Sequence, residues 1–268
     1  MTQLLVADAA TDTRWADRRR RAAELRARHD FVAEPLALYA RLLDAREEAY
    51  AAARAERPAP EKLAAWVVER SLPGVMAAAM EAGTELLREA VLLRFHDGDL
   101  EGIVGRWLEG AELSATDAFL ARAATGPALE ALPETAQALR RVDAGPRACP
   151  RCGGLPQLAY FAPTDDALLT GSRTLVCARC AHEWVAPRMT CAWCGETDTA
   201  RLTIFDAVEA IPQVRVDACE SCTRFLLTID PRKDAAAVPE VDEIAALPLH
   251  LAAEERGFTK ITPDLLGF

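Results

Sequence analysis

All eight cysteines of this 268-residue chain lie in four Cys-x-x-Cys knuckles between residues 149 and 222. Two residues between the cysteines of one knuckle allow both sulfurs to bind the same metal ion, and two knuckles brought together complete a tetrahedral four-sulfur site. Such sites suit both zinc and iron of the rubredoxin type. The pattern therefore predicts two metal ions, iron or zinc, each bound by four of the cysteines Cys149, Cys152, Cys177, Cys180, Cys191, Cys194, Cys219 and Cys222.

The knuckles repeat with a period of 42 residues. The first and third cysteines of each half are 28 positions apart, and the first half recurs 42 positions later. Other positions share the period: Gly153 and Gly195, Arg173 and Arg215, Trp184 and Leu226. The repeat indicates a duplicated ribbon. The simplest grouping is sequential, with Cys149 to Cys180 in one site and Cys191 to Cys222 in the other, and an interleaved grouping across the halves stays open.

Residues 15 to about 140 predict one helix after another. Leu36, Tyr39, Ala40 and Leu43 follow the i, i+3, i+4, i+7 spacing of an amphipathic helix. We expect the last helix to begin at Pro127, because proline suits a first turn. We expect the side chains of Trp66, Phe95 and Trp107 to lie in the core of this helical region. We expect Arg18 to Arg21 to form a helix face exposed to solvent.

The composition of the chain changes after residues 143–146, where Cys, Gly, Thr and Val become more frequent. Short runs that predict strands follow at 158–161, 173–176, 201–205, 214–216 and 225–229. A helix is expected from Val241 to about Arg256. The predicted fold class is therefore α+β and multidomain. It consists of an all-helical domain (1–142), two tandem rubredoxin-like or zinc-ribbon modules (143–188 and 189–230) and a tail with a short helix (231–268).

Acidity extends along the whole chain, whose net charge is −10. Basic and acidic residues number 20 against 24 in 1–148, 7 against 10 in 149–230 and 4 against 7 in 231–268. This balance argues against nucleic acid as a partner. Apolar runs fall short of the roughly 20 residues of a membrane span, and no apolar signal core follows Arg18 to Arg21. We expect a cytoplasmic protein without membrane insertion, in which such cysteines bind metal or act in redox chemistry.

Several side chains near the knuckles have two interpretations. His182 is expected to be exposed or to lie behind the ligands, because four cysteines already complete the site. Trp193 either covers its site or contacts a partner. Arg173 and Arg215 either stabilise thiolate charge or cap a strand. No Ser/His/Asp arrangement, phosphate loop or His-Glu-x-x-His helix is present, so the sequence predicts no enzymatic activity.

The sequence around these knuckles resembles the formate dehydrogenase accessory protein family FdhE. The stretches that carry the resemblance are Gly171 to Trp184, Met189 to Cys194, Ala218 to Leu226, and a close from Ala253 to Phe258 followed by Pro-Asp-Leu-Leu-Gly-Phe. The likeness is strong over 149–268 and loose over 15–140. Ser221 departs from the family's pattern in the fourth knuckle, which leaves ligation unaffected.

The resemblance implies a non-catalytic, metal-binding factor for maturation or quality control of respiratory formate dehydrogenase. Such a factor would bind the catalytic subunit of that enzyme in the cytoplasm, before its export, with cysteine knuckles linked to iron of the rubredoxin type. Two other functions compete with it: a rubredoxin-like electron carrier and a nucleic-acid-binding zinc ribbon. A carrier rarely needs a helical domain of this size, and the acidity of every segment opposes the zinc ribbon.

Overall fold

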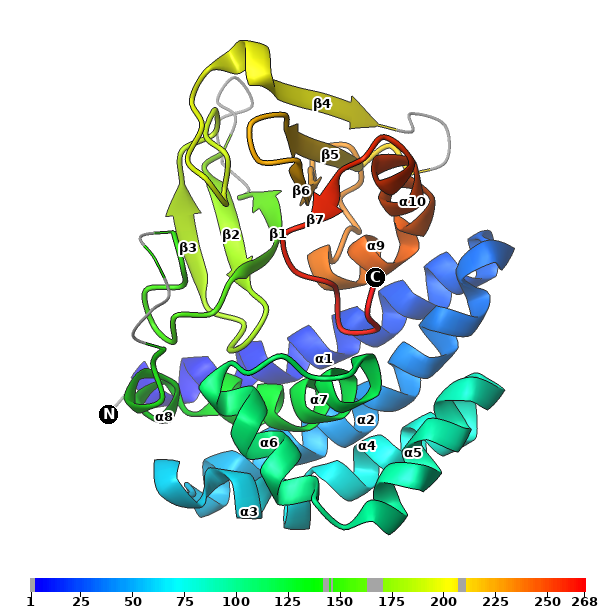
Figure 1. The fold of residues 1–268 in the computed structure, drawn as a ribbon, viewed down its shortest axis with the longest axis vertical. Coiled ribbons are helices and arrows are strands. Elements are labelled where there is room, and N and C mark those ends of the chain that lie inside the picture. Colours follow the sequence, from blue (N-terminus) through cyan, green and yellow to red (C-terminus); the bar gives the residue numbers. More distant parts are fainter. Residues whose placement is uncertain (1–2, 142–144, 146, 163–170, 207–210) are drawn as a thin grey trace.

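The structure is a computed structural model that describes residues 3–141, 145, 147–162, 171–206 and 211–268. Figure 1 shows a layer of helices on one side and a twisted sheet on the other, with the last two helices beside the sheet. The helices are α1 (Gln3–Arg28), α2 (Ala33–Glu56), α3 (Leu63–Arg70), α4 (Leu72–Ala82), α5 (Glu85–Asp97), α6 (Leu100–Glu109), α7 (Ala115–Ala131), α8 (Pro133–Ala138), α9 (Pro239–Ala245) and α10 (Leu247–Glu255). The predicted order of a helical region followed by a sheet-containing region is confirmed.

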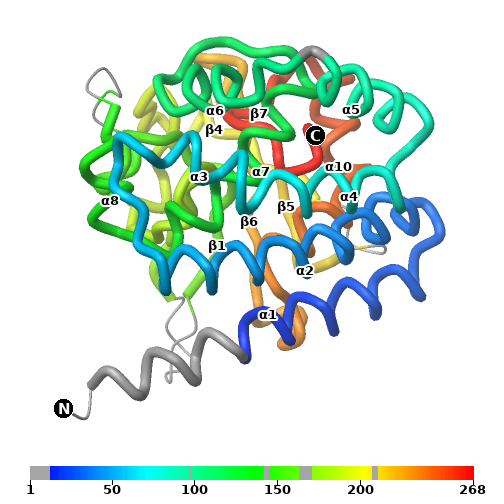
Figure 2. Tube along the Cα trace, turned by 90° about the horizontal axis from the view of Figure 1, so that it is seen from below, coloured from blue at the N-terminus to red at the C-terminus, as the bar shows by residue number. Residues whose placement is uncertain are grey.

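Helix α2 forms the centre of the helical layer. It packs against α1, α4 and α7, and Figure 2 shows α1 and α2 running side by side. The expected amphipathic stripe is present, because Leu36, Leu43 and Tyr39 are buried while Ala40 is half-buried. None of the described helices has an apolar stretch long enough to cross a membrane.

Pro127 lies inside α7 and does not begin a helix, so the sequence-based prediction was wrong at this point. A proline in a helix interior removes one N–H donor and leaves the carbonyl four residues earlier without its partner. Here that carbonyl belongs to Ala123, and it accepts a hydrogen bond of 3.2 Å from Arg46 Nη1. The next carbonyl, that of Ala124, accepts a hydrogen bond of 2.7 Å from the Ser71 hydroxyl. Side chains of other helices thus make an interior proline tolerable.

The sheet contains both halves of the repeat in one hydrogen-bonded array. Its order is β3-β2-β1-β6-β5-β4, with β7 beside β6. Within each half the strands are antiparallel, and β1 joins the two halves by pairing with β6 in parallel. The strands are β1 (Pro156–Phe161), β2 (Arg173–Cys177), β3 (Glu183–Ala186), β4 (Leu202–Asp206), β5 (Val214–Cys219), β6 (Arg224–Ile229) and β7 (Thr259–Lys260).

The 42-residue period reappears in the strands, since β2 and β3 shifted by 42 positions fall on β5 and β6. All five predicted extended runs are strands, and β3 and β7 are additional. The predicted tail helix is two helices, α9 and α10, interrupted at Ala246 just ahead of Pro248. Trp184 and Leu226 pack in one small apolar cluster, as their matching places in the repeat suggest.

The basic run Arg18 to Arg21 was expected to face solvent, and for two of its members the structure contradicts this. Arg21 is 1% exposed and binds the buried carboxylate of Asp242 in α9 through two hydrogen bonds of 2.6 and 3.0 Å. Arg18 is 5% exposed and contacts Glu240 at 2.5 Å. Because α9 lies more than 200 positions away, local sequence could not reveal these partners. The pairs fasten α9 to α1.

Phe95 on α5 was expected in the core, but the structure places it at the surface. Trp66 is buried and Trp107 is half-buried against the core, but Phe95 is 63% exposed together with its neighbours Leu86, Leu92 and Leu93. Helix α5 lies at the periphery of the helical layer, where it covers α4 on one side and leaves its other side uncovered in this chain.

Candidate metal centres

The eight sulfurs form two clusters of four, grouped as the sequential pairing predicts. Within each cluster all four Sγ atoms lie within 4.8 Å of one another. Centre 1 has Sγ–Sγ distances of 3.8 Å (Cys149–Cys180) and 3.4 Å (Cys152–Cys177). Centre 2 has 3.7 Å for both Cys191–Cys222 and Cys194–Cys219.

These separations match a metal ion at the centre of a sulfur tetrahedron. A Zn–S bond of about 2.3 Å gives an edge of about 3.8 Å between sulfurs, and an iron–sulfur tetrahedron is of similar size. Both clusters have the donor set and the dimensions to hold zinc or iron. The interleaved grouping does not fit, because cysteines of different halves belong to different clusters.

Each knuckle turns through one residue with positive φ, directly after its second cysteine. Gly153 has φ of 70° and Gly195 of 85°, as expected from the glycines. The equivalent residues in the other two knuckles are Ala181 (51°) and Thr223 (55°), which the sequence did not mark. Left-handed backbone costs a residue with a Cβ roughly 1–2 kcal/mol. All four knuckles adopt this left-handed conformation, because the turn directs backbone N–H groups and both sulfurs of a knuckle toward one point.

Backbone N–H groups point at the sulfurs. Those of Gly154 and Arg179 donate to Cys152 and Cys177 at 3.3 Å, and that of Trp193 donates to Cys191 at 3.4 Å. Hydrogen bonds to the charged form stabilise a thiolate. The knuckles are therefore shaped for deprotonated sulfur, the form that binds a metal.

Centre 1 lies in the interior, where the sheet meets the helices. Its four cysteines are at most 3% exposed. Arginines cover it by donating to knuckle carbonyls. Arg179, itself 3% exposed, donates to Cys152 O (3.0 Å) and to Leu139 O and Leu108 O of the helical region (2.8 Å each). From α7, Arg122 donates to Ala178 O at 3.1 Å. A divalent ion with four thiolates carries a net charge of −2, and the guanidinium groups of Arg122 and Arg179 offset it.

Centre 2 lies at the surface. Cys191 and Cys219 are buried, but Cys222 is half-buried and Cys194 is exposed. The residue at the place of Arg179 in the repeat is Ser221, whose hydroxyl donates to the exposed Glu196 carboxylate at 2.5 Å. Two centres with equivalent spacing in the sequence thus have different environments.

The pKa values of centre 1 separate the thiols into two kinds. Hydrogen bonds from the thiols of Cys149, Cys177 and Cys180 hold the pKa of Cys152 far below its ordinary value. Hydrogen bonds to Cys149 and Cys152, together with burial, raise the pKa of Cys177 well above its ordinary value. Ligation requires all four sulfurs as thiolates, so metal binding releases protons and its affinity falls as pH is lowered.

The other predicted site residues are placed as follows. His182 is outside both clusters, half-buried, and its ring stacks on Trp184. Trp193 is 38% exposed, with the Arg224 guanidinium 4.2 Å from its ring centre. Arg173 and Arg215 both face Asp217, and only Arg173 is buried. Two further residues, Arg122 and Arg179, contact centre 1 without having been predicted, and only Arg179 has a signal in the sequence, its position inside a knuckle.

The difference in exposure predicts metal release in two phases. When the metal-loaded chain is mixed with a chromophoric chelator, one equivalent is expected to leave rapidly and the other much more slowly. A chelator can approach centre 2 from the side of the exposed Cys194, whereas release from centre 1 requires local opening of the core. Stopped-flow absorbance measures both phases. Release of both equivalents at one rate would contradict the difference.

Comparison with known proteins agrees with this arrangement. The family model for the FdhE C-terminal domain matches residues 189–266. An FdhE homolog from Aquifex aeolicus is 33% identical over 120 residues, which cover 45% of this chain and 41% of that protein. A homolog from Pseudomonas putida is 31% identical over 121 residues, covering 44% and 37%. The matched part thus spans about two-fifths of the length of these relatives. The crystal structure of the FdhE protein from Pseudomonas aeruginosa has the same fold, with a TM-score of 0.66, 22% identity and 94% coverage of both chains.

Proposed function

We propose that this chain, which belongs to the FdhE family, is a non-catalytic accessory factor for the maturation or quality control of respiratory formate dehydrogenase. In this function it binds two metal ions and the catalytic subunit of that enzyme in the cytoplasm. The observation that carries the proposal is the pair of four-sulfur clusters within an FdhE fold.

In this proposal the metal ions stabilise the conformation of the surface that binds the partner. Ligation by all four cysteines of centre 1 joins both knuckles of the first half to each other, and arginines join them to the helical region. Ligation by the four cysteines of centre 2 would in the same way join the two knuckles of the second half, including the exposed loop around Trp193. Thiolate–metal closure contributes stability on the order of 10 kcal/mol in small metal-binding domains, enough to order such loops.

A cleft beside the knuckles supports a partner-binding function. It has a volume of about 840 Å³ and lies between the ends of α6 and α8 and the first knuckle of each half. Its lining includes the exposed Trp193 and the guanidinium groups of Arg140, Arg141 and Arg147. Tryptophan and arginine are the side chains that contribute most to protein–protein affinity.

One observation favours a second function, that of an electron carrier. Cys194 of centre 2 is exposed, which would give an electron a short path from an iron ion to a partner. An electron carrier requires that iron at this centre be reduced and reoxidised reversibly. Anaerobic purification followed by visible spectroscopy through one redox cycle tests this second function, because the principal proposal does not require the metal to change oxidation state.

Capture of the partner tests the principal proposal. The tagged chain, purified from anaerobic cells, is expected to retain the formate dehydrogenase catalytic subunit, and Trp193→Ala is expected to lose it with metal content unchanged. Arg20→Ala, at a position 68% exposed on α1, is the matched surface control. In a deletion strain, formate dehydrogenase activity should fall and be restored by the wild-type chain. Full activity in that strain, with no subunit captured, would refute the proposal.

A further inference from the structure

We propose that Arg173 is a positioning residue for centre 2, although it belongs to the first half of the repeat. The proposal rests on metal binding by the two clusters, as proposed above. Arg173 begins β2, the strand that ends at Cys177 of centre 1. Its guanidinium contacts residues that lead into the two knuckles of centre 2.

The contact with the first of these knuckles is a hydrogen bond. Arg173 Nη1 donates to the carbonyl of Thr190 at 2.9 Å, and Thr190 directly precedes Cys191. The same nitrogen lies 3.5 Å from the carbonyl of Pro187. This side chain therefore fixes the path by which the chain leaves β3 and enters the knuckle.

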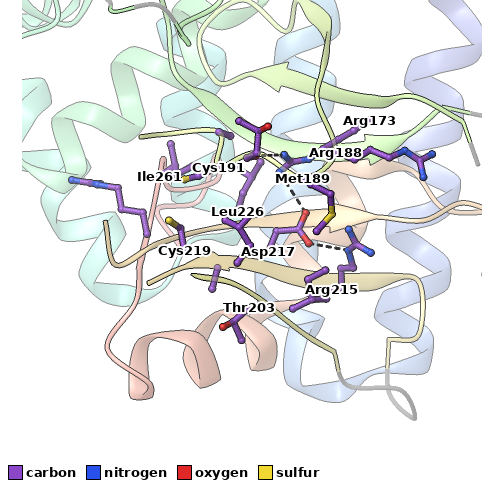
Figure 3. A pocket seen from close by; sticks show the side chains of 16 residues that line it. Arg173, Arg188, Met189, Cys191, Thr203, Arg215, Asp217, Cys219, Leu226 and Ile261 are labelled. Atoms are coloured by element: carbon purple, nitrogen blue, oxygen red, sulfur yellow. Dashed lines mark hydrogen bonds and ion pairs between the residues drawn. The ribbon is translucent and has the colours of Figure 1, made fainter. Parts of the chain in front are cut away.

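The contact with the second knuckle is an ion pair. Arg173 Nη2 is 3.4 Å from Asp217 Oδ2, and Asp217 lies on β5 two residues before Cys219. Figure 3 shows Asp217 between Arg173 and Arg215, with Cys191 and Cys219 beside them. The Asp217 carboxylate also accepts a hydrogen bond of 2.7 Å from the Thr228 hydroxyl, which holds it in place on the sheet. One guanidinium thus connects the backbone before Cys191 to the strand that carries Cys219.

Burial makes this connection rigid. Arg173 is 3% exposed, and the cavity lined by these residues is about 30 Å³, room for one or two water molecules. Contacts beside so small a cavity are screened less by solvent than contacts at the surface. Its counterpart one repeat later, Arg215, also pairs with Asp217, at 2.9 Å, but its side chain is 27% exposed and no described contact links it to the backbone before Cys191. The repeat therefore supplies a matched control.

A metal-affinity measurement on the full chain tests the proposal. Zinc is competed from the loaded protein with a chromophoric chelator at equilibrium. Arg173→Met is expected to weaken one zinc equivalent by about 10- to 100-fold, the usual effect of removing a residue that orients ligands. The other equivalent should be unchanged. Arg173→Lys should lie in between, because an ammonium cannot serve both acceptors equally well. Arg215→Met should match the wild type.

A second variant identifies the affected centre. In a Cys194→Ser background, where centre 2 has lost a ligand, adding Arg173→Met should leave the remaining tight equivalent unchanged. If Arg173→Met does not fold, Asp217→Asn tests the same connection and should weaken the same equivalent. Equal weakening of both equivalents, or none, would overturn the proposal. A wild-type chain that binds no zinc or iron would instead refute the metal-binding function itself.

Discussion

Replacement of Cys152 by serine is expected to abolish the folded state, whereas Cys194→Ser leaves the chain folded with one metal ion fewer. The two cysteines are counterparts one repeat apart. Cys152 is fully buried at the contact between sheet and helices, and Cys194 is exposed. A structural metal contributes on the order of 10 kcal/mol or more, which is comparable to the 5–15 kcal/mol that separate a typical folded protein from its unfolded state.

Loss of centre 1 removes that contribution and leaves three thiols and polar backbone buried in the core. Loss of centre 2 loosens only surface loops, because β5 and β6 remain buried through Val216, Phe225 and Leu227. Soluble yield, near-ultraviolet circular dichroism and metal content per chain measure the difference. Equal effects of the two replacements would contradict the assignment of a core function to centre 1.

Arg21→Met is expected to lower the free energy of unfolding by about 3–5 kcal/mol, the cost of leaving one charge of a buried pair without its partner. The carboxylate so exposed to an apolar environment is Asp242, which is completely buried. Its other hydrogen bonds, from Gln213 Nε2 at 2.6 Å and the backbone N–H of Val238 at 2.7 Å, do not neutralise it. Helix α9 would then separate from α1.

The neighbouring Arg20→Met is the matched control. Arg20 is 68% exposed and pairs with Asp17 one turn away, so its removal should change stability by less than about 0.5 kcal/mol. Urea titration measures both variants, with an unchanged slope as evidence that two-state unfolding is retained. Adding Asp242→Leu to Arg21→Met should recover part of the loss, since an apolar pair replaces the single charge. A stability loss of similar size for both arginines would show that burial of the pair is unimportant.

Local patterns in the sequence predicted much of this molecule. Cysteine spacing identified the four knuckles, because a two-residue loop brings both of its sulfurs to one point, but it left the grouping of the knuckles open until the structure placed them in two clusters. Short extended runs predicted five of the strands, and the 42-residue period predicted a duplicated ribbon. Proline was less informative. Pro127 does not begin a helix as predicted, because Arg46 and Ser71 from outside α7 satisfy the carbonyls of Ala123 and Ala124.

The sequence alone established that the chain has two four-cysteine centres of equal spacing, since covalent distance along a short loop is enough to specify a knuckle. It could not show that they are unequal. That difference arises from contacts between residues far apart in the chain: Arg122 and Arg179 cover centre 1 with the helical region, while centre 2 keeps an exposed Cys194 and depends on Arg173 from the other half. Burial and long-range charge pairs exist only after folding brings these segments together, so only the tertiary structure distinguishes the two centres.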